Sequence, residues 1–380
     1  MIGILNVQWF DNPGAVLLCY ALQQTLAELG WESIVLNYVS GGALPPPFFK
    51  RIMRKLRSEK TKMAWIENEY FGRLLRIRCQ KYEAFRSQYL RRTLPFKEVD
   101  SQLLYGYDIY IVGSDVVWKP EILLSRDADV YFLSFLSDTF KAKRISYAAS
   151  IGTTDNEILS VLEEKYKVRL QMFDHISVRE KESVIFLQRL CKQTVHQMPD
   201  PVFLLKKEQY DTLAVSRTCA EEYIYLYMLT PNQKAINFAL ALSERSGLQI
   251  LYDVHSDDNL FLRRLFRGKG RAVVSDGPAE FLSRICHAKY VVTNSFHGTA
   301  FSLIFEKEVY AFSAQNAGID TSVRLKDLLS TVGLQYRYNC VFNWENIRSI
   351  NYQVVRASLY ELRERGRDYL QQVLESDVRR

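Results

Sequence analysis

Residues 288–304 read AKYVVTNSFHGTAFSLI, and this stretch decides the fold of the region around it. The apolar residues 288–292 predict a short buried strand. The strand ends at 293–295, where Thr, Asn and Ser side chains satisfy the free backbone N–H groups that open a helix. A small and apolar run then predicts the helix itself. This order gathers backbone donors and a positive helix end at the carboxyl end of a strand, where open α/β sheets bind ligands.

A phosphate or a carboxylate would fit this turn. We expect Asn294, Ser295 and His297 to bind such a ligand, because His297 is the histidine with the richest polar surroundings. The alternative on local sequence alone is a buried histidine that caps a helix. Both interpretations are open at this point.

The composition is that of a soluble globular protein, with 48% hydrophobic and 24% charged residues. A chain of 380 residues is long enough for two domains. The 50 basic and 43 acidic residues give a net charge of +7. That excess suits anionic ligands but is far from a nucleic-acid-binding signature, so no nucleic acid partner is expected.

Several kinds of site and targeting segment are not indicated. The six cysteines lack metal-ligand spacing, so no metal site is predicted. The dinucleotide fingerprint and the Walker lysine–serine pair are also missing, so no cofactor is expected. The N-terminus runs directly into a predicted strand, and no apolar run reaches membrane-spanning length. We therefore expect a cytoplasmic protein.

The first half alternates strands and helices, which predicts a doubly wound parallel sheet over residues 1–205. A turn at 11–14 leads into a helix with leucines at helical spacing that ends at Gly30. The predicted strands are 2–7, 33–36, 107–112, 144–149 and 175–178.

An insertion at about 41–92 interrupts this pattern. It opens with three prolines, continues with a basic cluster at 50–62 and shows helical spacing at 82–90. One interpretation is a solvated, charged helix face. The other is a patch for an anionic membrane or glycan, and it predicts a peripheral contact at the inner membrane face through 50–62.

Residues 206–218 are polar enough for a linker, and a second alternation of strands and helices fills 219–345. Its predicted strands are 223–227, 249–252, 272–274, 290–292 and 309–312. An apolar stripe predicts a closing helix at 351–374. The predicted fold class is therefore α/β, with two Rossmann-like domains, a C-terminal helix and a ligand cleft between the domains.

Several segments, in chain order, carry a resemblance to a known family. They are Asn12-Pro13-Gly14-Ala15-Val16-Leu17 with Tyr20-Ala21-Leu22-Gln23, Tyr107-Asp108, Val112-Gly113-Ser114-Asp115-Val116-Val117-Trp118, Ser146-Tyr147-Ala148-Ala149-Ser150-Ile151-Gly152, Ser177-Val178-Arg179-Glu180, Asp200-Pro201-Val202, Thr293-Asn294-Ser295-Phe296-His297-Gly298, and Ser322-Val323-Arg324-Leu325 with Leu328-Leu329. Together they resemble the polysaccharide pyruvyl transferase family, although Val116 stands where that family commonly has glutamine. The resemblance implies a GT-B-like arrangement of the two Rossmann-like domains. It also implies transfer of the enolpyruvyl part of phosphoenolpyruvate to a sugar.

Phosphoenolpyruvate carries a carboxylate and a phosphate, so its recognition needs at least two cationic donors, preferably arginines. Arg179 follows a predicted strand and Arg324 precedes a predicted helix, and both match the family's motifs. The alternative for each is a surface arginine paired with Glu180 or Asp327.

The reaction must protonate the methylene carbon of phosphoenolpyruvate, which makes a cation for a sugar hydroxyl to attack. A general acid with a pKa near the working pH is needed, so His297 is the first candidate. Asp115 is the second, as base for the acceptor hydroxyl, with Ser114 beside it at the strand end as a substrate-binding residue. A turn cap formed by these two residues is the alternative. Asn12 and Gly14 open the first helix, where a glycine lets the backbone approach a ligand.

We therefore predict a transferase that produces a pyruvate ketal and phosphate. Its partners would be phosphoenolpyruvate and a saccharide or lipid-linked glycan acceptor. A nucleotide-sugar glycosyltransferase of GT-B type and a non-catalytic glycan-binding paralogue are the alternatives. The donor pocket is predicted between the domains, from Arg179, Ser295, His297 and Arg324.

Overall fold

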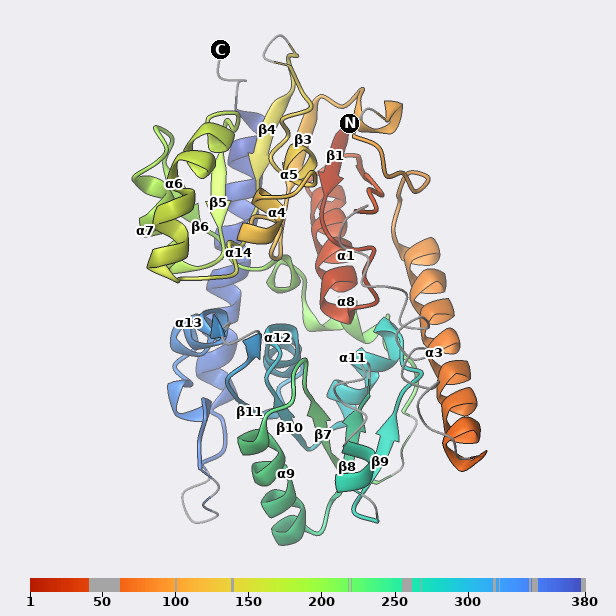
Figure 1. The fold of residues 1–380 in the computed structure, drawn as a ribbon. Helices are drawn as coiled ribbons and strands as arrows, with labels where there is room; N and C mark the ends of the chain where they lie inside the picture. The colour runs from red at the N-terminus through yellow and green to blue at the C-terminus, as the bar shows by residue number, and fades with distance from the viewer. Residues whose placement is uncertain are drawn as a thin grey trace. The chain divides into compact units, whose positions relative to one another are not determined.

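The computed structural model describes residues 1–40, 62–99, 101–137, 140–217, 219, 221–254, 262–266, 268–316, 319–320, 322–341, 343 and 348–376. The chain divides into two compact units (Figure 1). Unit 1 comprises Met1–Gly42, Ser87–Lys206 and Gln353–Arg380, and unit 2 comprises Ala43–Arg86 and Lys207–Tyr352. Each unit contains its own parallel sheet, as the alternating pattern of the sequence predicts.

Unit 1 contains the N-terminal sheet, the helices between its strands and the C-terminal helix. Its strands are β1 (Ile2–Leu5), β2 (Ser33–Val35), β3 (Ile109–Val112), β4 (Lys143–Ser146), β5 (Ile176–Val178) and β6 (Val195–Gln197). Its helices are α1 (Pro13–Glu28), α4 (Pro120–Leu123), α5 (Ala128–Tyr131), α6 (Asn156–Leu170), α7 (Lys181–Gln188) and α14 (Tyr352–Glu375), with 3-10 turns η1 (Gln102–Leu104) and η2 (Pro201–Phe203).

Four strands of unit 1 pair in the parallel order β2-β1-β3-β4. β5 and β6 pair with each other, and single bridges from Ile145 to His175 and from Ala149 to Val178 join them to β4. The strand order reverses between β1 and β3, so their carboxyl ends form the topological switch point of this sheet. β6 was not predicted, because His196 in its middle is exposed and breaks the apolar pattern.

The C-terminal helix α14 belongs to unit 1 from Gln353 onward. A β-carbon at Gly366 would stand 2.5 Å from Leu204 Cδ2 and 2.6 Å from Tyr147 Oη, so glycine allows the close approach of this helix. At the far end, Lys143 Nζ donates to the carbonyl oxygen of Val373 at 2.9 Å. This bond satisfies a carbonyl that the helix end leaves open.

Unit 2 contains the second sheet and the helices packed on it. Its strands are β7 (Tyr223–Tyr227), β8 (Gln249–Asp253), β9 (Gly270–Val273), β10 (Tyr290–Thr293), β11 (Glu308–Ala311), β12 (Gln315–Asn316) and β13 (Ile319–Asp320). Its helices are α3 (Lys62–Tyr89, up to Arg86), α8 (Lys207–Asp211), α9 (Gln233–Ser246), α10 (Leu262–Leu265), α11 (Pro278–His287), α12 (Phe296–Ile304) and α13 (Val323–Thr331), with a 3-10 turn η4 (Gln335–Arg337).

The main sheet of unit 2 has the parallel order β11-β10-β7-β8-β9. The strand order reverses between β7 and β10, where Tyr227 pairs with Thr293. The switch point therefore lies at the carboxyl ends of these two strands. The predicted α/β class, with two Rossmann-like units and a C-terminal helix, is confirmed.

The predicted helical insertion is only partly described, and its helix belongs to a different unit from the one we predicted. α3 joins unit 2 because Arg78 is buried there, 3.5 Å from Asp253 and 3.4 Å from the carbonyl oxygen of Val274. In a charged stretch, a buried arginine cannot be distinguished from a solvated one by periodicity. The basic cluster at 50–62, with the membrane contact predicted for it, lies outside the residues whose side chains are described.

Candidate functional site

The turn after β10 uses its polar side chains to shape the backbone of unit 2. Asn294 Oδ1 accepts from the N–H of Leu229 at 2.8 Å, and its Nδ2 donates to the carbonyl oxygen of Thr230 at 2.8 Å. The Thr293 hydroxyl donates to the carbonyl oxygen of Tyr227 at 2.6 Å. These bonds tie the carboxyl end of β10 to that of β7, at the switch point of the sheet.

His297 lies in the first turn of α12. Ser295 caps this helix, because its hydroxyl accepts from the N–H of Gly298 at 3.2 Å. The imidazole is 7% exposed and lies edge-on to the Phe296 ring, with the ring centroids 5.3 Å apart. A β-carbon at Gly298 would stand 2.6 Å from Thr293 Oγ1, so the tight turn requires glycine. The predicted strand–turn–helix unit is present, and its helix start provides positive potential for an anion.

Arg324 lies half-buried in the first turn of α13. The residue before this helix, Ser322, accepts from the N–H of Ala314 at 2.9 Å. Ala314 follows β11, where the N–H of Phe312 donates to the carbonyl oxygen of Thr293 at 2.8 Å. α13 also packs against α12. The structure therefore brings Arg324 and the histidine turn to the same edge of one sheet.

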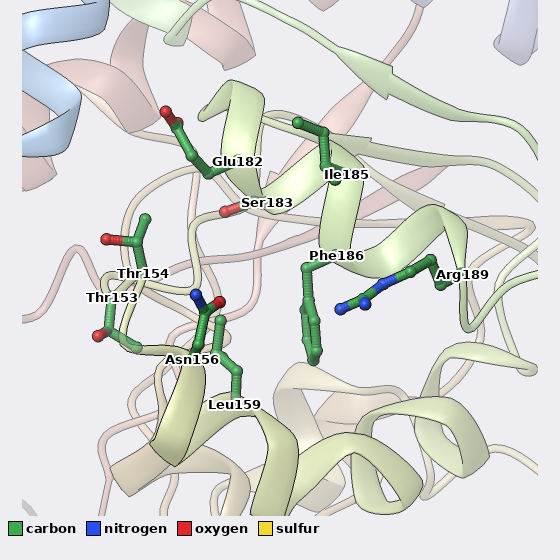
Figure 2. A pocket seen from close by; sticks show the side chains of 9 residues that line it. All are labelled: Thr153, Thr154, Asn156, Leu159, Glu182, Ser183, Ile185, Phe186 and Arg189. Atoms are coloured by element: carbon green, nitrogen blue, oxygen red, sulfur yellow. The ribbon is translucent and has the colours of Figure 1, made fainter.

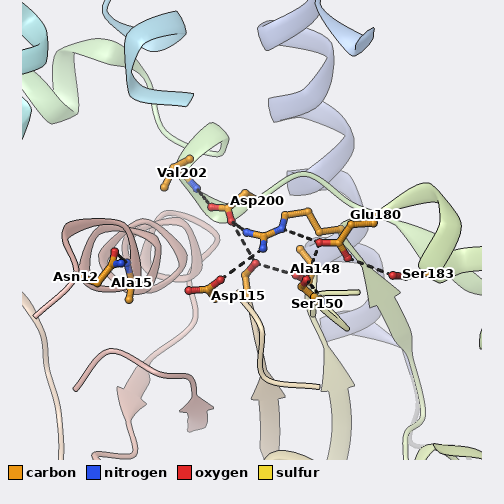
Figure 3. Close-up of polar contacts among 12 residues, drawn as sticks. Asn12, Ala15, Asp115, Ala148, Ser150, Glu180, Ser183, Asp200 and Val202 are labelled. Atoms are coloured by element: carbon orange, nitrogen blue, oxygen red, sulfur yellow. Dashed lines mark hydrogen bonds and ion pairs between the residues drawn. The ribbon is translucent and has the colours of Figure 1, made fainter. Parts of the chain in front are cut away.

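Arg179 follows β5 and lies at the centre of a buried ion network in unit 1, whose carboxylates Figure 3 shows. Its Nη1 lies 2.5 Å from Asp200 Oδ2, its Nε 3.3 Å from Glu180 Oε1 and its Nη2 3.5 Å from Asp115 Oδ1. Burial by itself lowers the pKa of this guanidinium, but the three carboxylates together raise the pKa of Arg179 above its ordinary value. The pairing with Glu180 that the sequence left open is present, and two further carboxylates join it.

Asp115 is the most exposed carboxylate of this network, with 16% of its side chain exposed against 4% for Glu180 and 0% for Asp200. It has a backbone φ of 69°, and Ala148 at the end of the next strand has a φ of 47°. Such left-handed conformations are costly for residues other than glycine and cluster at functional sites. Ser114 is fully buried, and its hydroxyl donates to the carbonyl oxygen of Ala148 at 2.8 Å.

Asn12 and Gly14 open α1, which follows the strand at the switch point of unit 1. Asn12 Oδ1 accepts from the N–H of Ala15 at 3.3 Å and so caps the helix. Gly14 is buried within the first turn. The structure thus explains why these residue types begin the helix, and their role in ligand binding stays a prediction.

Glu180 and Asp200 belong to this ion network but are not among the predicted site residues. Each lay in a recognised motif, but the sequence does not show that both share one arginine. The sequence contains only local signals for these two residues. Glu180 directly follows Arg179 at a predicted strand end, and Asp200 precedes a proline and caps η2 by accepting from the N–H of Val202 at 3.1 Å.

The predicted site residues fall into two groups. Asn12, Gly14, Ser114, Asp115 and Arg179 lie in unit 1, and Asn294, Ser295, His297 and Arg324 lie in unit 2. The donor pocket predicted between the domains therefore stays a prediction. Within the described ranges, no group of three or more His, Cys, Asp or Glu side chains is placed to hold a metal ion. No described helix is both long and apolar enough to cross a membrane.

The chain is similar to several solved structures at low sequence identity. The UDP-GlcNAc 2-epimerase from Methanocaldococcus jannaschii in complex with UDP-GlcNAc and UDP is 10% identical, with a TM-score of 0.48 over 98% of each chain. Arabidopsis thaliana UGT89C1 complexed with UDP-L-rhamnose is 10% identical, with a TM-score of 0.45 over 98% of each chain. AviGT4, a glycosyltransferase involved in avilamycin A biosynthesis, is 10% identical, with a TM-score of 0.45 over 98% of this chain and 96% of that one. The comparison with curated protein sequences gives no match.

A family model, described as polysaccharide pyruvyl transferase, matches residues 12–316. This range covers most of the chain and contains every predicted site residue except Arg324. The resemblance that the sequence motifs indicated is confirmed, and with it the assignment as a transferase that modifies glycans. The chain belongs to the polysaccharide pyruvyl transferase family.

Proposed function

We propose that the protein transfers the enolpyruvyl group of phosphoenolpyruvate to a pair of saccharide hydroxyls, giving a pyruvate ketal and phosphate. The histidine turn carries this proposal. His297 stands at a helix start with Arg324 in the first turn of a neighbouring helix. A titratable group and a cation beside a positive helix end suit a substrate that carries both a carboxylate and a phosphate. Family membership supports the class of reaction.

In the proposed reaction, His297 donates a proton to the methylene carbon, and the neighbouring carbon becomes a cation. The first sugar hydroxyl forms a C–O bond to that carbon, and its proton passes to Asp115. The C–O bond to phosphate then breaks, and the second hydroxyl closes the ring with loss of its proton. Of the two hydroxyl protons, one replaces the proton given by His297 and the other neutralises one charge of the departing phosphate.

The ion network of unit 1 supports the role of Asp115 as base. Arg179 pairs with Asp115 at 3.5 Å and is itself held by Glu180 and Asp200. A carboxylate whose partner is fixed by two further groups keeps one orientation, which is what a general base needs. In this scheme Arg179 is a positioning residue, and donor binding depends on Arg324 of unit 2.

The test measures phosphate release from phosphoenolpyruvate with a panel of methyl pyranosides as acceptor probes, together with the mass of the product. His297→Ala should reduce turnover about 100- to 10,000-fold with little change in donor affinity. Arg324→Ala removes a charge-assisted contact of about 1.5–3 kcal/mol, so it should weaken donor binding by roughly ten- to a hundred-fold. Lys326→Ala, an exposed lysine on the same helix, serves as the control.

One result would reject the role of His297, and another would reject the reaction itself. Near-normal phosphate release by His297→Ala would make the histidine a structural cap and move the acid role to another group. Consumption of a UDP-sugar in the absence of phosphoenolpyruvate would instead identify a nucleotide-sugar glycosyltransferase.

A further inference from the structure

A pocket of about 280 Å³ lies in unit 1 between α6 and α7 (Figure 2). α6 follows β4 and α7 follows β5, so both walls start from the carboxyl edge of the sheet, where open α/β sheets bind ligands. The proposed roles of His297 and Arg324 do not use this pocket. Its polar and aromatic lining includes Thr153, Thr154, Asn156, Ser183, Phe186 and Arg189.

The lining combines apolar side chains with hydroxyl and amide groups. Phe186 is buried, and its ring is held edge-on against Tyr166 with the centroids 5.7 Å apart. The Arg189 guanidinium lies over the same ring, with its Cζ 5.7 Å from the centroid. Figure 2 shows Thr154 and Asn156 across the pocket from these two side chains. A pyranose ring presents an apolar C–H face and a rim of hydroxyls, which this combination matches.

Hydrogen bonds connect the pocket to the network that holds Asp115. The Ser183 hydroxyl, in the pocket wall, donates to Glu180 Oε2 at 3.3 Å. Glu180 Oε1 accepts from Arg179 Nε at 3.3 Å, and Arg179 Nη2 lies 3.5 Å from Asp115. The pocket wall is therefore connected, through Glu180 and Arg179, to the carboxylate that we assign as base.

We infer that this pocket binds one pyranose ring of the saccharide acceptor. Ligand pockets typically measure about 300–1,000 Å³, and a volume of about 280 Å³, just below that range, suits a single ring better than a nucleoside diphosphate. One acidic and one basic side chain, Glu182 and Arg189, line the pocket, so their formal charges cancel and a neutral sugar is the expected occupant. That the bound sugar is the acceptor rests on the proposed function. Binding of the sugar itself can be measured without the reaction.

The binding test uses methyl-labelled protein and NMR titration with methyl pyranosides in the absence of phosphoenolpyruvate. Ile185 and Leu159 both line the pocket, so their methyl signals report its occupation directly. We expect at least one methyl pyranoside to shift both signals in a saturable way. In the double variant Thr154→Val, Arg189→Gln, the affinity should fall about tenfold or more, because polar contacts to a charged group are lost. Lys165→Gln, an exposed lysine on α6 outside the pocket lining, should bind like the wild type.

The inference is overturned if no methyl pyranoside shifts these methyl signals, or if the double variant binds as tightly as the wild type while its melting temperature is unchanged. Kinetics separate this failure from that of the proposed function. If phosphate is released normally and the double variant keeps the KM of the acceptor probe, the pocket is not the acceptor site and the reaction stands. If the probe binds but phosphoenolpyruvate is never consumed, the sugar site stands and the reaction falls.

Discussion

The two strand-end sites use their polar residues in opposite ways. In unit 2, Asn294 and Ser295 bond to backbone groups, so the motif shapes a turn that presents His297. In unit 1, Arg179 bonds to carboxylate side chains and shares its charge among them. Losing a side chain therefore has different consequences: in unit 2 it leaves a backbone group without a partner, and in unit 1 it leaves buried charges uncompensated.

The largest expected effect comes from Arg179→Met. Removing the cation leaves Asp200 and Glu180 buried without their shared partner, and breaking such a pair costs about 3–5 kcal/mol. We expect chemical denaturation to show a loss of this size, and hydrogen exchange to show the loss in β3 to β5. Arg126→Met, an exposed arginine of the same unit, should change stability by less than about 0.5 kcal/mol.

The measured stability of Arg179→Met also decides between two roles for Arg179. If the variant is as stable as the wild type and instead loses affinity for phosphoenolpyruvate, Arg179 is the donor-binding residue that the family resemblance implied. The contrast between the two sites would then disappear, because in each of them an arginine would bind the donor.

A smaller effect is expected from Asn294→Ala in unit 2. The N–H of Leu229 and the carbonyl oxygen of Thr230 lose their side-chain partner, and an orphaned buried polar group costs about 1–3 kcal/mol. Asn294→Asp keeps the acceptor for Leu229 but turns a carboxylate toward the carbonyl of Thr230. This variant should therefore be no more stable than Asn294→Ala. Faster exchange of the Leu229 amide in Asn294→Ala than in Asn294→Asp would support this account, and equal exchange in the two variants would contradict it.

The contrast between the sites also explains what the sequence could predict. The site of unit 2 occupies consecutive residues, so the apolar run, the Thr-Asn-Ser turn and Gly298 indicated strand, turn and helix directly. The site of unit 1 joins segments up to 86 positions apart, as the bond between Ser114 and Asp200 shows. Sequence patterns found each segment but could not show that Glu180 and Asp200 share one arginine.

The positions of the strands were predictable because parallel strands buried on both faces form short apolar runs bounded by turns. What could not be predicted depends on tertiary contacts. β6 contains an exposed histidine that breaks its apolar pattern. The helix of the insertion is held in unit 2 by the buried Arg78, and the sequence alone does not distinguish this arginine from the many charged residues around it. The pocket between α6 and α7 is likewise a product of packing and has no signature in the sequence.

A third substitution separates structure from binding within the histidine turn. Ser295→Ala removes the cap of α12 and should cost about 1 kcal/mol. Ser295→Asp restores a capping oxygen but adds a negative charge next to the proposed anion site. We therefore expect Asp to retain stability but to weaken binding of phosphoenolpyruvate more than Ala does, whereas Ala should lose stability. Equal affinity for the two variants would place the donor elsewhere.

The smallest expected effect concerns a second ion pair in unit 2, between Asp276 and Arg284, 2.9 Å apart. Burial raises the pKa of Asp276 above its ordinary value of 3.8, and although Arg284 opposes the rise, the carboxylates of Asp253 and Glu280 add to it. Between the ordinary and the raised pKa the folded state binds more protons than the unfolded state, so stability falls as the pH rises through that interval. Asp276→Asn should remove this fall, and Glu244→Gln, a change on the exposed part of α9, should preserve it. Thermal unfolding across the weakly acidic range measures both slopes. A wild-type stability that rises with pH more steeply than that of Asp276→Asn would show that Arg284 outweighs burial. This pair would then compensate its buried charges, like the network around Arg179.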